Sequence, residues 1–310
     1  DLRVSILPTR LGETVCLRVL SRDDLSLEFE RLGMPPEEQE RVKGVMGLSQ
    51  GMVLLTGPTG SGKTTTLYTA LQHSRDEGRK IITVEDPVEY QMRGVSQIQV
   101  RPDIGLTFSS GLRSILRHDP DVVLIGEIRD RETADIAVRA SQTGHLVLST
   151  LHTNDSPSAV IRLIDMGIEP FLVASSLICS IAQRLVRLNC RNCVREEPVV
   201  DAALRAEMAA ALALEPGETR CMRGTGCVEC GERGYRGREA IYEFLYISDE
   251  MSNRIEPGLS LSKLREMARI EGWRPLREVG WKKVQDGITS IEEHQRVTRR
   301  AEHVLRRRVL

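Results

Sequence analysis

The chain has 310 residues, enough for about two domains with a sizeable core, which excludes a peptide hormone, a fibre and a disulfide-stabilised mini-protein. Its 43 basic and 44 acidic residues leave a net charge of −1, so no overall field attracts nucleic acid or acidic membranes. No apolar run reaches the ~20 residues of a membrane-spanning helix. Seven cysteines without a signal peptide predict a reducing compartment, in which thiols bind metal or stay buried.

The first predicted element is a β-hairpin. Residues 2–20 alternate apolar and polar side chains around a turn at Gly12, which predicts two short strands. An isolated hairpin is only marginally stable and the chain starts without Met, so we expect a fragment whose further strands lie upstream. Residues 21–50 are polar and are predicted to form a linker and then a helix that Pro35 and Pro36 open.

From residue 51, short apolar runs alternate with helical segments. The runs are continuously apolar, which predicts strands of a parallel sheet covered on both faces. The predicted strands are 52–56, 80–84, 122–125 and 145–150. The predicted helices are 63–73, 108–118, 131–142 and 156–165. This order predicts a doubly wound α/β domain of the nucleotide-binding kind.

The last third of the chain is predicted to be mostly helical. An alanine-rich helix over 201–214 lies between two groups of cysteines. Further along, Ser260 or Ser262 caps one helix, and Ser290 with Glu293 has the spacing of a capping box. Arginines in the final 15 residues fit a solvated C-terminal helix, or a patch for an acidic partner or the membrane surface.

A glycine-rich loop follows the first strand of the α/β segment. The run from Gly57 to Thr64, GPTGSGKT, matches the P-loop pattern in full and stands between a strand and a helix. Its backbone N–H groups can converge on phosphate oxygens, Lys63 adds a positive charge, and the Thr64 hydroxyl can bind Mg²⁺. We therefore predict ATP and Mg²⁺ as ligands, with the nucleotide bound by Gly57, Pro58, Thr59, Gly60, Ser61, Gly62, Lys63, Thr64 and Thr65.

Ionisable groups follow the other predicted strands. Because ligands of open α/β sheets bind beyond the carboxyl ends of the strands, we expect Glu85, Glu127 and His152 at one rim beside the P-loop. Glu127 is the candidate for the metal-side carboxylate, and either Glu85 or Glu127 could orient or deprotonate the attacking water. His152 and His145 are both candidate catalytic histidines, although they lie seven residues apart and so cannot form a simple metal pair. For His145, a packed or hydrogen-bonded histidine is the alternative.

Four cysteines form two CxxC pairs separated by 33 residues, namely Cys190, Cys193, Cys227 and Cys230. Each CxxC turn places two thiolates on one face, and two such turns complete a closed tetrahedral shell around Zn²⁺. We predict a structural zinc site, with a redox dithiol or unliganded thiols as the alternatives. Cys16, Cys179 and Cys221 have no partner at ligand spacing and are predicted to be unliganded.

Four segments in chain order resemble the Walker A, Asp box, Walker B and His box of the secretion ATPase superfamily, which powers type II secretion and type IV pili: residues 57–66, 82–90, 117–130 and 143–155. The resemblance implies a RecA-like ATPase core and a cytoplasmic homohexamer. It also implies peripheral association with the cytoplasmic face of the inner membrane, through platform and recruitment proteins of the secretion or pilus machine. The resemblance further implies that the N-terminal domain of one subunit packs over the nucleotide of another.

The same resemblance assigns catalytic arginines. Arg3 and Arg18 match arginines of the family's second N-terminal domain, and Arg113 and Arg117 match arginines before Walker B. An arginine that reaches the transferred phosphoryl group from a neighbouring subunit can raise the rate by ~10³ to 10⁵. From their spacing alone, Arg113 and Arg117 would be a solvated helix face.

The implied organisation is an α/β chain with five parts. These are a remnant of the second N-terminal α+β domain (1–21), a linker and leading helix (22–50), a RecA-like P-loop core (51–189), a tetracysteine zinc module (190–233) and a helical C-terminal domain (234–310).

Several functions remain open at this stage. The CxxC pairs and the segment 234–243 resemble the secretion and pilus assembly branches more than the retraction branch, so a type II secretion ATPase is favoured, with pilus extension as the alternative. A nucleic-acid-dependent motor is disfavoured by the near-neutral charge and the few aromatic residues, and no nucleic-acid partner is expected. A non-catalytic scaffold is disfavoured by the intact Lys63, Thr64, Glu85 and Glu127.

Overall fold

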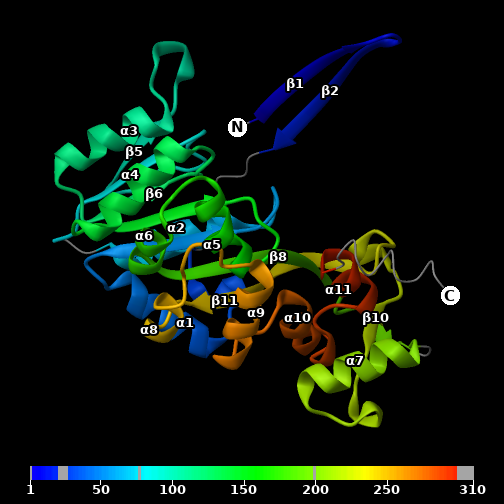
Figure 1. The fold of residues 1–310 in the computed structure, drawn as a ribbon. Coiled ribbons are helices and arrows are strands. Elements are labelled where there is room, and N and C mark those ends of the chain that lie inside the picture. Colours follow the sequence, from blue (N-terminus) through cyan, green and yellow to red (C-terminus); the bar gives the residue numbers. More distant parts are fainter. Residues whose placement is uncertain (1, 20–26, 76–77, 198–199, 299–310) are drawn as a thin grey trace.

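The computed structural model describes residues 2–19, 27–75, 78–197 and 200–298 (Figure 1). Its core is a seven-stranded sheet whose strands, from edge to edge, are β11 (Tyr235–Tyr246), β8 (Leu177–Asn189), β3 (Gly51–Thr56), β7 (Leu146–Leu151), β6 (Val122–Ile125), β4 (Ile81–Glu85) and β5 (Val95–Gln99). The strands from β8 to β5 are parallel, and β11 joins β8 antiparallel. The predicted doubly wound, RecA-like α/β core is confirmed.

The central strands form because their side chains are apolar on both faces. Every residue of β3, β4, β6 and β7 is buried. Full burial of an aliphatic side chain contributes about 1.5–3 kcal/mol, so these strands hold the residues at their carboxyl ends in fixed positions. β5, at the edge of the sheet, is only partly buried.

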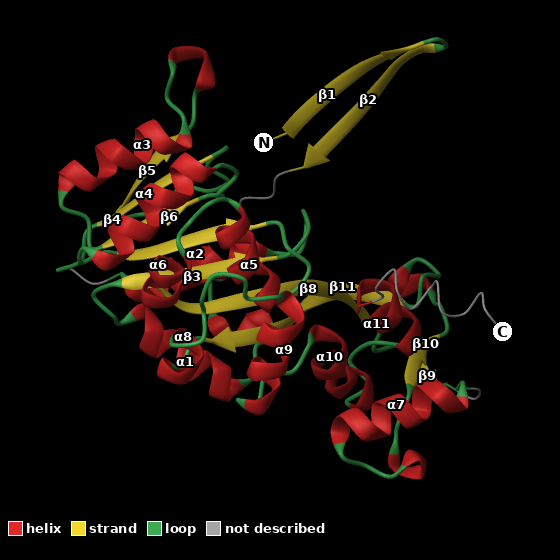
Figure 2. Cartoon of the chain, in the orientation of Figure 1, coloured by secondary structure: helices red, strands yellow, loops and turns green. Residues whose placement is uncertain are grey.

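Helices cover both faces of this sheet (Figure 2). One face carries α1 (Pro36–Met46) and α2 (Lys63–Ser74), and the other carries α3 (Phe108–Ile115), α4 (Arg131–Gln142), α5 (Ser156–Asp165) and α6 (Pro170–Ser176). Leu67 and Leu71 of α2 join the apolar cluster of the first face, and Leu112 of α3 joins that of the second. Because α2 follows the central strand β3 directly, its N-terminus lies at the carboxyl edge of the sheet.

The predicted core helices match the structure closely. The helices over 131–142 and 156–165 have the expected bounds, and α2 ends one residue later than expected. The predicted helix 108–118 is α-helical only to Ile115 and continues as a 3₁₀ turn to His118.

Three strands of the sheet, β5, β8 and β11, are absent from the sequence prediction. The prediction of helix from residue 234 is wrong at its start, where β11 extends the core sheet. β8 contains Gln183, Arg184 and Arg187, so it lacks the continuous apolar run that marks a buried strand. Both segments are strands because they pair with each other along almost their whole lengths, an interaction between distant parts of the chain.

The predicted N-terminal hairpin is present as a separate two-stranded sheet (Figure 1), made of β1 (Leu2–Thr9) and β2 (Gly12–Val19). Its register sets Arg3 opposite Arg18. In the described ranges of the chain, no helix has both the length and the apolar character needed to cross a membrane.

A small arm separates the two cysteine pairs, and it consists of β9 (Val194–Glu196), α7 (Ala202–Leu212) and β10 (Met222–Gly224), with β9 and β10 paired. The C-terminal helices are α8 (Asp249–Ser252), α9 (Leu261–Ile270), α10 (Leu276–Gln285) and α11 (Ile291–Thr298). Met208 of α7 and Trp281 of α10 share one apolar cluster, and Glu207 pairs with Arg277. The arm is therefore packed on the C-terminal helices.

The helix starts near the C-terminus follow the sequence prediction in part. Ser260 caps α9 through the Lys263 N–H group. At the start of α11, the Ser290 hydroxyl accepts a hydrogen bond from the Glu293 N–H group at 3.1 Å. The expected capping box is incomplete, because the Glu293 carboxylate turns instead toward β8. Most arginines of the final 15 residues lie outside the described residues.

The Glu293 carboxylate joins α11 to the core sheet. It is fully buried and accepts hydrogen bonds from the backbone N–H and Nε of Arg187, both at 2.9 Å, and from Arg296 Nε at 2.7 Å. Burial raises the pKa of Glu293, but the two arginines outweigh that effect and hold the pKa at about 2. A carboxyl group with a lowered pKa stabilises the fold above its unfolded-state pKa, and this stabilisation is lost as the pH falls toward 2.

Glu293→Gln is therefore expected to lower the free energy of unfolding at pH 7 by about 1.5–3 kcal/mol, the range for hydrogen bonds to charged groups. Urea denaturation at pH 7 and at pH 2.5 measures the effect, and the difference between wild type and variant should shrink at the lower pH. Glu292→Gln, an exposed neighbour on the same helix, is the matched control. A difference that is equal at both pH values would contradict the role of the ionised carboxylate.

Candidate functional site

The P-loop connects the central strand β3 to α2. Gly62 has a φ of 89° and precedes the first residue of the helix, a left-handed conformation that favours glycine. At Gly57, an added Cβ would lie 2.5 Å from the backbone oxygen of Gln183 on β8, so the close approach of the loop to β8 requires glycine. Pro58, Thr59 and Gly60 are exposed, and so is Thr64 at the start of α2, which leaves the outer side of the loop open to a ligand.

Lys63 is a buried cation with carbonyl partners. Its Nζ donates to the backbone oxygens of Gly57 at 2.7 Å and Pro58 at 3.1 Å. Burial lowers the pKa of Lys63, and the charge of Glu127 opposes that change. Since no carboxylate lies within ion-pair distance of Lys63 in the described part of the chain, the site favours binding of an anion.

Glu127 lies just past β6 at the same rim. Its carboxylate contacts the guanidinium of Arg129 and lies 3.2 Å from His152 Nε2. Burial raises the pKa of Glu127, but Arg129 and His152 more than offset this, so the pKa is lower than usual and the group is ionised at neutral pH. An ionised carboxylate beside a P-loop can bind Mg²⁺ or accept a proton from water.

Glu85, the last residue of β4, is enclosed on the α2 face of the sheet. Its carboxylate accepts hydrogen bonds from Tyr68 Oη, from Thr83 Oγ1 at 2.5 Å and from Gln97 Nε2 at 3.2 Å. Burial and the hydrogen bond to Glu85 raise the pKa of Tyr68. Of the two candidate carboxylates, Glu127 is the one in contact with a guanidinium and an imidazole, whereas hydrogen bonds from neutral groups surround Glu85.

The structure does not bring His145 to this rim. It precedes β7, and its Nδ1 lies 2.9 Å from the backbone oxygen of Ala140. His152 follows the other end of the strand, and the six residues of β7 span about 20 Å. Within one chain, the two histidines therefore cannot contact the same nucleotide.

Among the described residues, neither Arg113 nor Arg117 has a hydrogen bond or ion pair with the P-loop. Arg113 on α3 pairs with Glu132, and Arg117 donates to the Arg113 backbone oxygen at 2.9 Å. Both side chains are exposed. Arg3 and Arg18 are opposite each other on the hairpin, and their side chains lie outside the described part of the structure.

Two residues of β8 reach the P-loop and are not among the residues predicted from the sequence. Gln183 Oε1 accepts a hydrogen bond from Thr66 Oγ1 at 2.9 Å, and an added Cβ at Gly62 would lie 2.8 Å from Gln183 Nε2. Arg184 donates to the Asn154 backbone oxygen at 2.9 Å. The adjacent polar residues Gln183 and Arg184 are visible in the sequence, but only the pairing of β8 with β3 shows that they lie beside the P-loop.

The four cysteines of the CxxC pairs meet at one point. Their sulfur atoms all lie within 4.8 Å of one another, with Sγ–Sγ distances of 3.8 Å for Cys190 and Cys227, 3.9 Å for Cys193 and Cys230, and 3.7 Å for Cys227 and Cys230. Sulfur ligands of tetrahedral zinc, with Zn–S bonds of about 2.3 Å, are about 3.8 Å apart. The donor set and its spacing therefore fit a closed four-thiolate metal site.

Backbone N–H groups stabilise the thiolate form of one of these cysteines, Cys230, which is the form that binds a metal. Cys230 Sγ accepts from the N–H groups of Cys227 and Gly234, both at 3.2 Å. Burial raises the pKa of Cys230, but these donors outweigh it and the pKa falls to about 7. At Gly224, an added Cβ would lie 1.9 Å from the Gly234 backbone oxygen, so glycine is needed for β10 to approach the second cysteine pair.

The sheet order and the loop after its central strand define the class of this chain, a RecA-like P-loop nucleoside triphosphatase domain. The family described as "Type II/IV secretion system protein" matches residues 1–296, and the chain belongs to this family.

Several known proteins are similar to the chain. Type II secretion system protein E of Pseudomonas aeruginosa is 48% identical over 302 residues, which cover 96% of this chain and 59% of that protein. The type IV pilus assembly ATPase PilB of Myxococcus xanthus is 46% identical over 299 residues, covering 94% of this chain and 52% of PilB. The chain thus spans little more than half the length of these relatives. The crystal structure of the pilus retraction motor PilT with bound ADP superposes with a TM-score of 0.70 at 26% identity, covering 98% of this chain and 76% of that one.

Proposed function

We propose that this chain is the motor part of a cytoplasmic homohexameric ATPase that powers type II protein secretion. The observation that carries the proposal is the rim at which a complete P-loop, the buried cation Lys63 and the ionised Glu127 lie together. The P. aeruginosa relative supports the secretion branch. Type IV pilus extension is the second candidate, because a pilus assembly ATPase is nearly as similar, at 46% against 48% identity.

In the proposed reaction, water attacks the γ-phosphate of ATP in line with the leaving oxygen. Lys63 and the N–H groups of the loop hold the phosphates, and His152 keeps the Glu127 carboxylate in place. Thr64 and Glu127 would hold Mg²⁺, which supplies charge neutralisation at the β- and γ-phosphates when bound. Glu127 has the position to orient the water or accept its proton, with Glu85 as the alternative base.

We further propose that arginines act across subunit boundaries. Arg113 and Arg117 are exposed on one side of the domain, and the ion pair of Arg113 with Glu132 is a surface pair worth at most about 1 kcal/mol. Such a pair can open when a phosphate of a neighbouring subunit is available. With Arg3 and Arg18 of the hairpin, these residues would complete a site that a single chain lacks.

The cysteine cluster supports a structural Zn²⁺ site, because four thiol sulfurs at tetrahedral spacing leave no open coordination position. We propose the domain division given above, with β11 added to the core sheet. The full protein is proposed to associate with the cytoplasmic face of the inner membrane through platform and recruitment proteins, and to need no nucleic acid.

ATP hydrolysis by the purified full-length protein tests this function. The rate per subunit is expected to rise with protein concentration as hexamers form, since the site needs a neighbouring subunit, and mass photometry should detect hexamers over the same range. Single-stranded DNA should leave the rate unchanged. Strong stimulation by DNA that is lost at high salt would instead support a nucleic-acid motor. Genes for a secretin and pseudopilins beside the gene would favour secretion, and genes for a pilin and a retraction ATPase would favour pilus extension.

A further inference from the structure

Arg184 occupies an unusual position beside the P-loop. β8 pairs with β3 up to Ala182 opposite Thr56, so the next residues of β8 run alongside the loop that starts at Gly57. An added Cβ at Gly57 would lie 3.0 Å from Arg184 Nη1. The guanidinium of Arg184 therefore lies beside Gly57, the first residue of the P-loop.

The hydrogen-bond partners of this guanidinium are uncharged. Nη1 donates to the backbone oxygen of Gln183 at 3.0 Å, and Nη2 donates to that of Asn154 at 2.9 Å. Among the described residues, no carboxylate lies within ion-pair distance of Arg184. Burial lowers the pKa of Arg184, which shows that its charge is poorly solvated, although Glu243 and Asp155 partly oppose this shift.

The acidic groups nearest to Arg184 have other partners. Asp155 pairs with Arg265 and accepts a hydrogen bond from the Ser158 N–H group at 3.0 Å. Glu243 accepts hydrogen bonds from the N–H groups of Ser156 and Leu276, both at 2.7 Å. Neither carboxylate is therefore available to neutralise Arg184 without breaking an existing helix cap.

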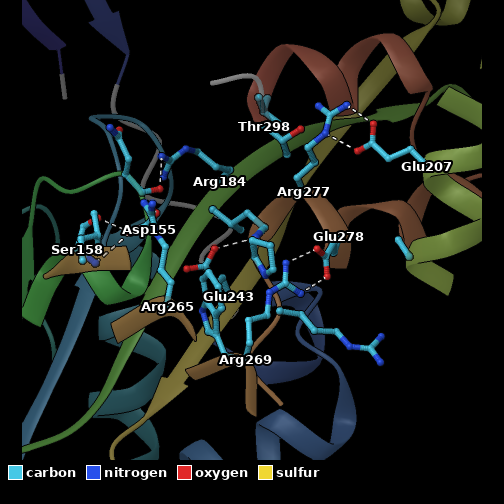
Figure 3. Close-up of a pocket in the computed structure, with 18 of the residues that line it drawn as sticks. Asp155, Ser158, Arg184, Glu207, Glu243, Arg265, Arg269, Arg277, Glu278 and Thr298 are labelled. Carbon is cyan, nitrogen blue, oxygen red and sulfur yellow. Dashed lines mark hydrogen bonds and ion pairs between the residues drawn. The ribbon is translucent and has the colours of Figure 1, made fainter. Parts of the chain in front are cut away.

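Arg184 differs in this from three other arginines around the same cavity; a further lining arginine, Arg274, is exposed to solvent. The cavity, of about 1100 Å³, lies between the core and the C-terminal helices (Figure 3). Three arginines that line it are each paired with a carboxylate: Arg265 with Asp155, Arg269 with Glu278 and Arg277 with Glu207. These pairs join α9 to the start of α5, α9 to α10 and α10 to α7, whereas Arg184 is directed to the P-loop.

Lys63 and Arg184 are two cations with no carboxylate of the described residues within ion-pair distance of either one. Both lie against the backbone of the P-loop, and the charge of Arg184 contributes to lowering the pKa of Lys63. Two like charges in a partly buried site are unfavourable unless an anion binds between them. The triphosphate of a nucleotide carries the charge and the oxygen acceptors that such a site lacks.

We propose that Arg184 contacts a phosphate group of the nucleotide bound by its own subunit. This inference rests on the proposed nucleotide-binding function and adds an arginine from the same chain to those expected from neighbouring subunits. On binding, the guanidinium exchanges the carbonyl oxygens of Gln183 and Asn154 for phosphate oxygens, which form stronger, charge-assisted hydrogen bonds.

The test compares ATP binding by wild type, Arg184→Gln and Arg195→Gln, measured by calorimetry with tripolyphosphate as a second ligand. Arg195 is the matched control, because it too donates to a backbone oxygen, that of Val194 at 2.7 Å, but is exposed on β9. Arg184→Gln is expected to weaken both ligands at least about 10-fold, as the loss of a charge-assisted hydrogen bond would, and Arg195→Gln to leave them unchanged.

Wild-type affinity in a folded Arg184→Gln variant would overturn the inference. Failure of the wild type itself to bind ATP would instead overturn the proposed function. A second measurement needs no variant: phenylglyoxal modification of arginines, mapped by mass spectrometry. Bound ATP is expected to protect Arg184 and not Arg195, and equal modification of Arg184 with and without ATP would also contradict the contact.

Discussion

Glu127→Gln is expected to lower the rate of ATP hydrolysis by at least about 10²-fold and to leave ATP binding nearly unchanged. The amide keeps the size of the side chain but can neither accept a proton from water nor supply negative charge to a metal ion. In the wild type, Arg129 and His152 hold this group ionised, so the full charge is lost in the variant. Steady-state turnover and calorimetric ATP affinity measure the two quantities separately.

Three further variants serve as comparisons for Glu127→Gln. Lys63→Ala should lose ATP binding as well as hydrolysis, because Lys63 is the buried cation of the loop. Asp135→Asn removes a partly exposed carboxylate that pairs with Arg139 on the same helix, and should leave both quantities unchanged. Full turnover in Glu127→Gln together with loss of turnover in Glu85→Gln would make Glu85 the base, and the assignment to Glu127 would be wrong.

Cys190→Ser is expected to reduce bound zinc from about one equivalent per chain to less than half an equivalent. Structural zinc sites supply about 10–16 kcal/mol of apparent binding free energy at neutral pH, so loss of one ligand should unfold the arm over residues 190–233. Because α7 of the arm packs on Trp281 of α10, the thermal midpoint of the C-terminal helices should fall as well. Inductively coupled plasma analysis and limited proteolysis followed by mass spectrometry provide the measurements.

Cys16→Ser is the control for this experiment. Cys16 is an exposed cysteine of the hairpin, so its replacement should change neither the zinc content nor the protease sensitivity of the arm. Less than half an equivalent of zinc in carefully reduced wild-type protein would contradict the zinc proposal directly. A disulfide between the CxxC cysteines under reducing conditions would instead favour the redox alternative.

The features that sequence reasoning located best are those whose chemistry lies in a short continuous segment. The P-loop is one run of eight residues from Gly57 to Thr64, and its glycines, cation and hydroxyl are specified by the motif itself. Because both residues follow the carboxyl ends of predicted strands, the sequence also predicted that Glu127 and His152 lie at the same rim. In the structure the two side chains are in contact. The same reasoning could not reveal that Glu85 is enclosed by Tyr68, Thr83 and Gln97, because these come from three different elements.

Features that depend on pairing between distant segments were not predictable in this way. β8 and β11 have mixed polar and apolar sequences, and they become strands of the core because each completes the hydrogen bonds of the other. The role inferred for Arg184 has the same origin, since only the pairing of β8 with β3 sets it beside the P-loop. For His145 the tertiary structure instead argues against a role at this site within one chain. His145 precedes β7, so it lies at the amino end of the strand, whereas the P-loop and His152 lie at the carboxyl end.

By itself, the sequence determined the α/β class, the phosphate-binding loop and the four-cysteine set, because each depends on local apolar patterning or on residues at fixed short spacing. Only the tertiary structure decided which strand flanks β3, which carboxylate contacts a guanidinium and which arginine lies beside the P-loop. Those properties depend on burial and on charges from elements far apart in the chain, and the free energy of an ionised group is set by the groups that folding brings within a few ångströms of it.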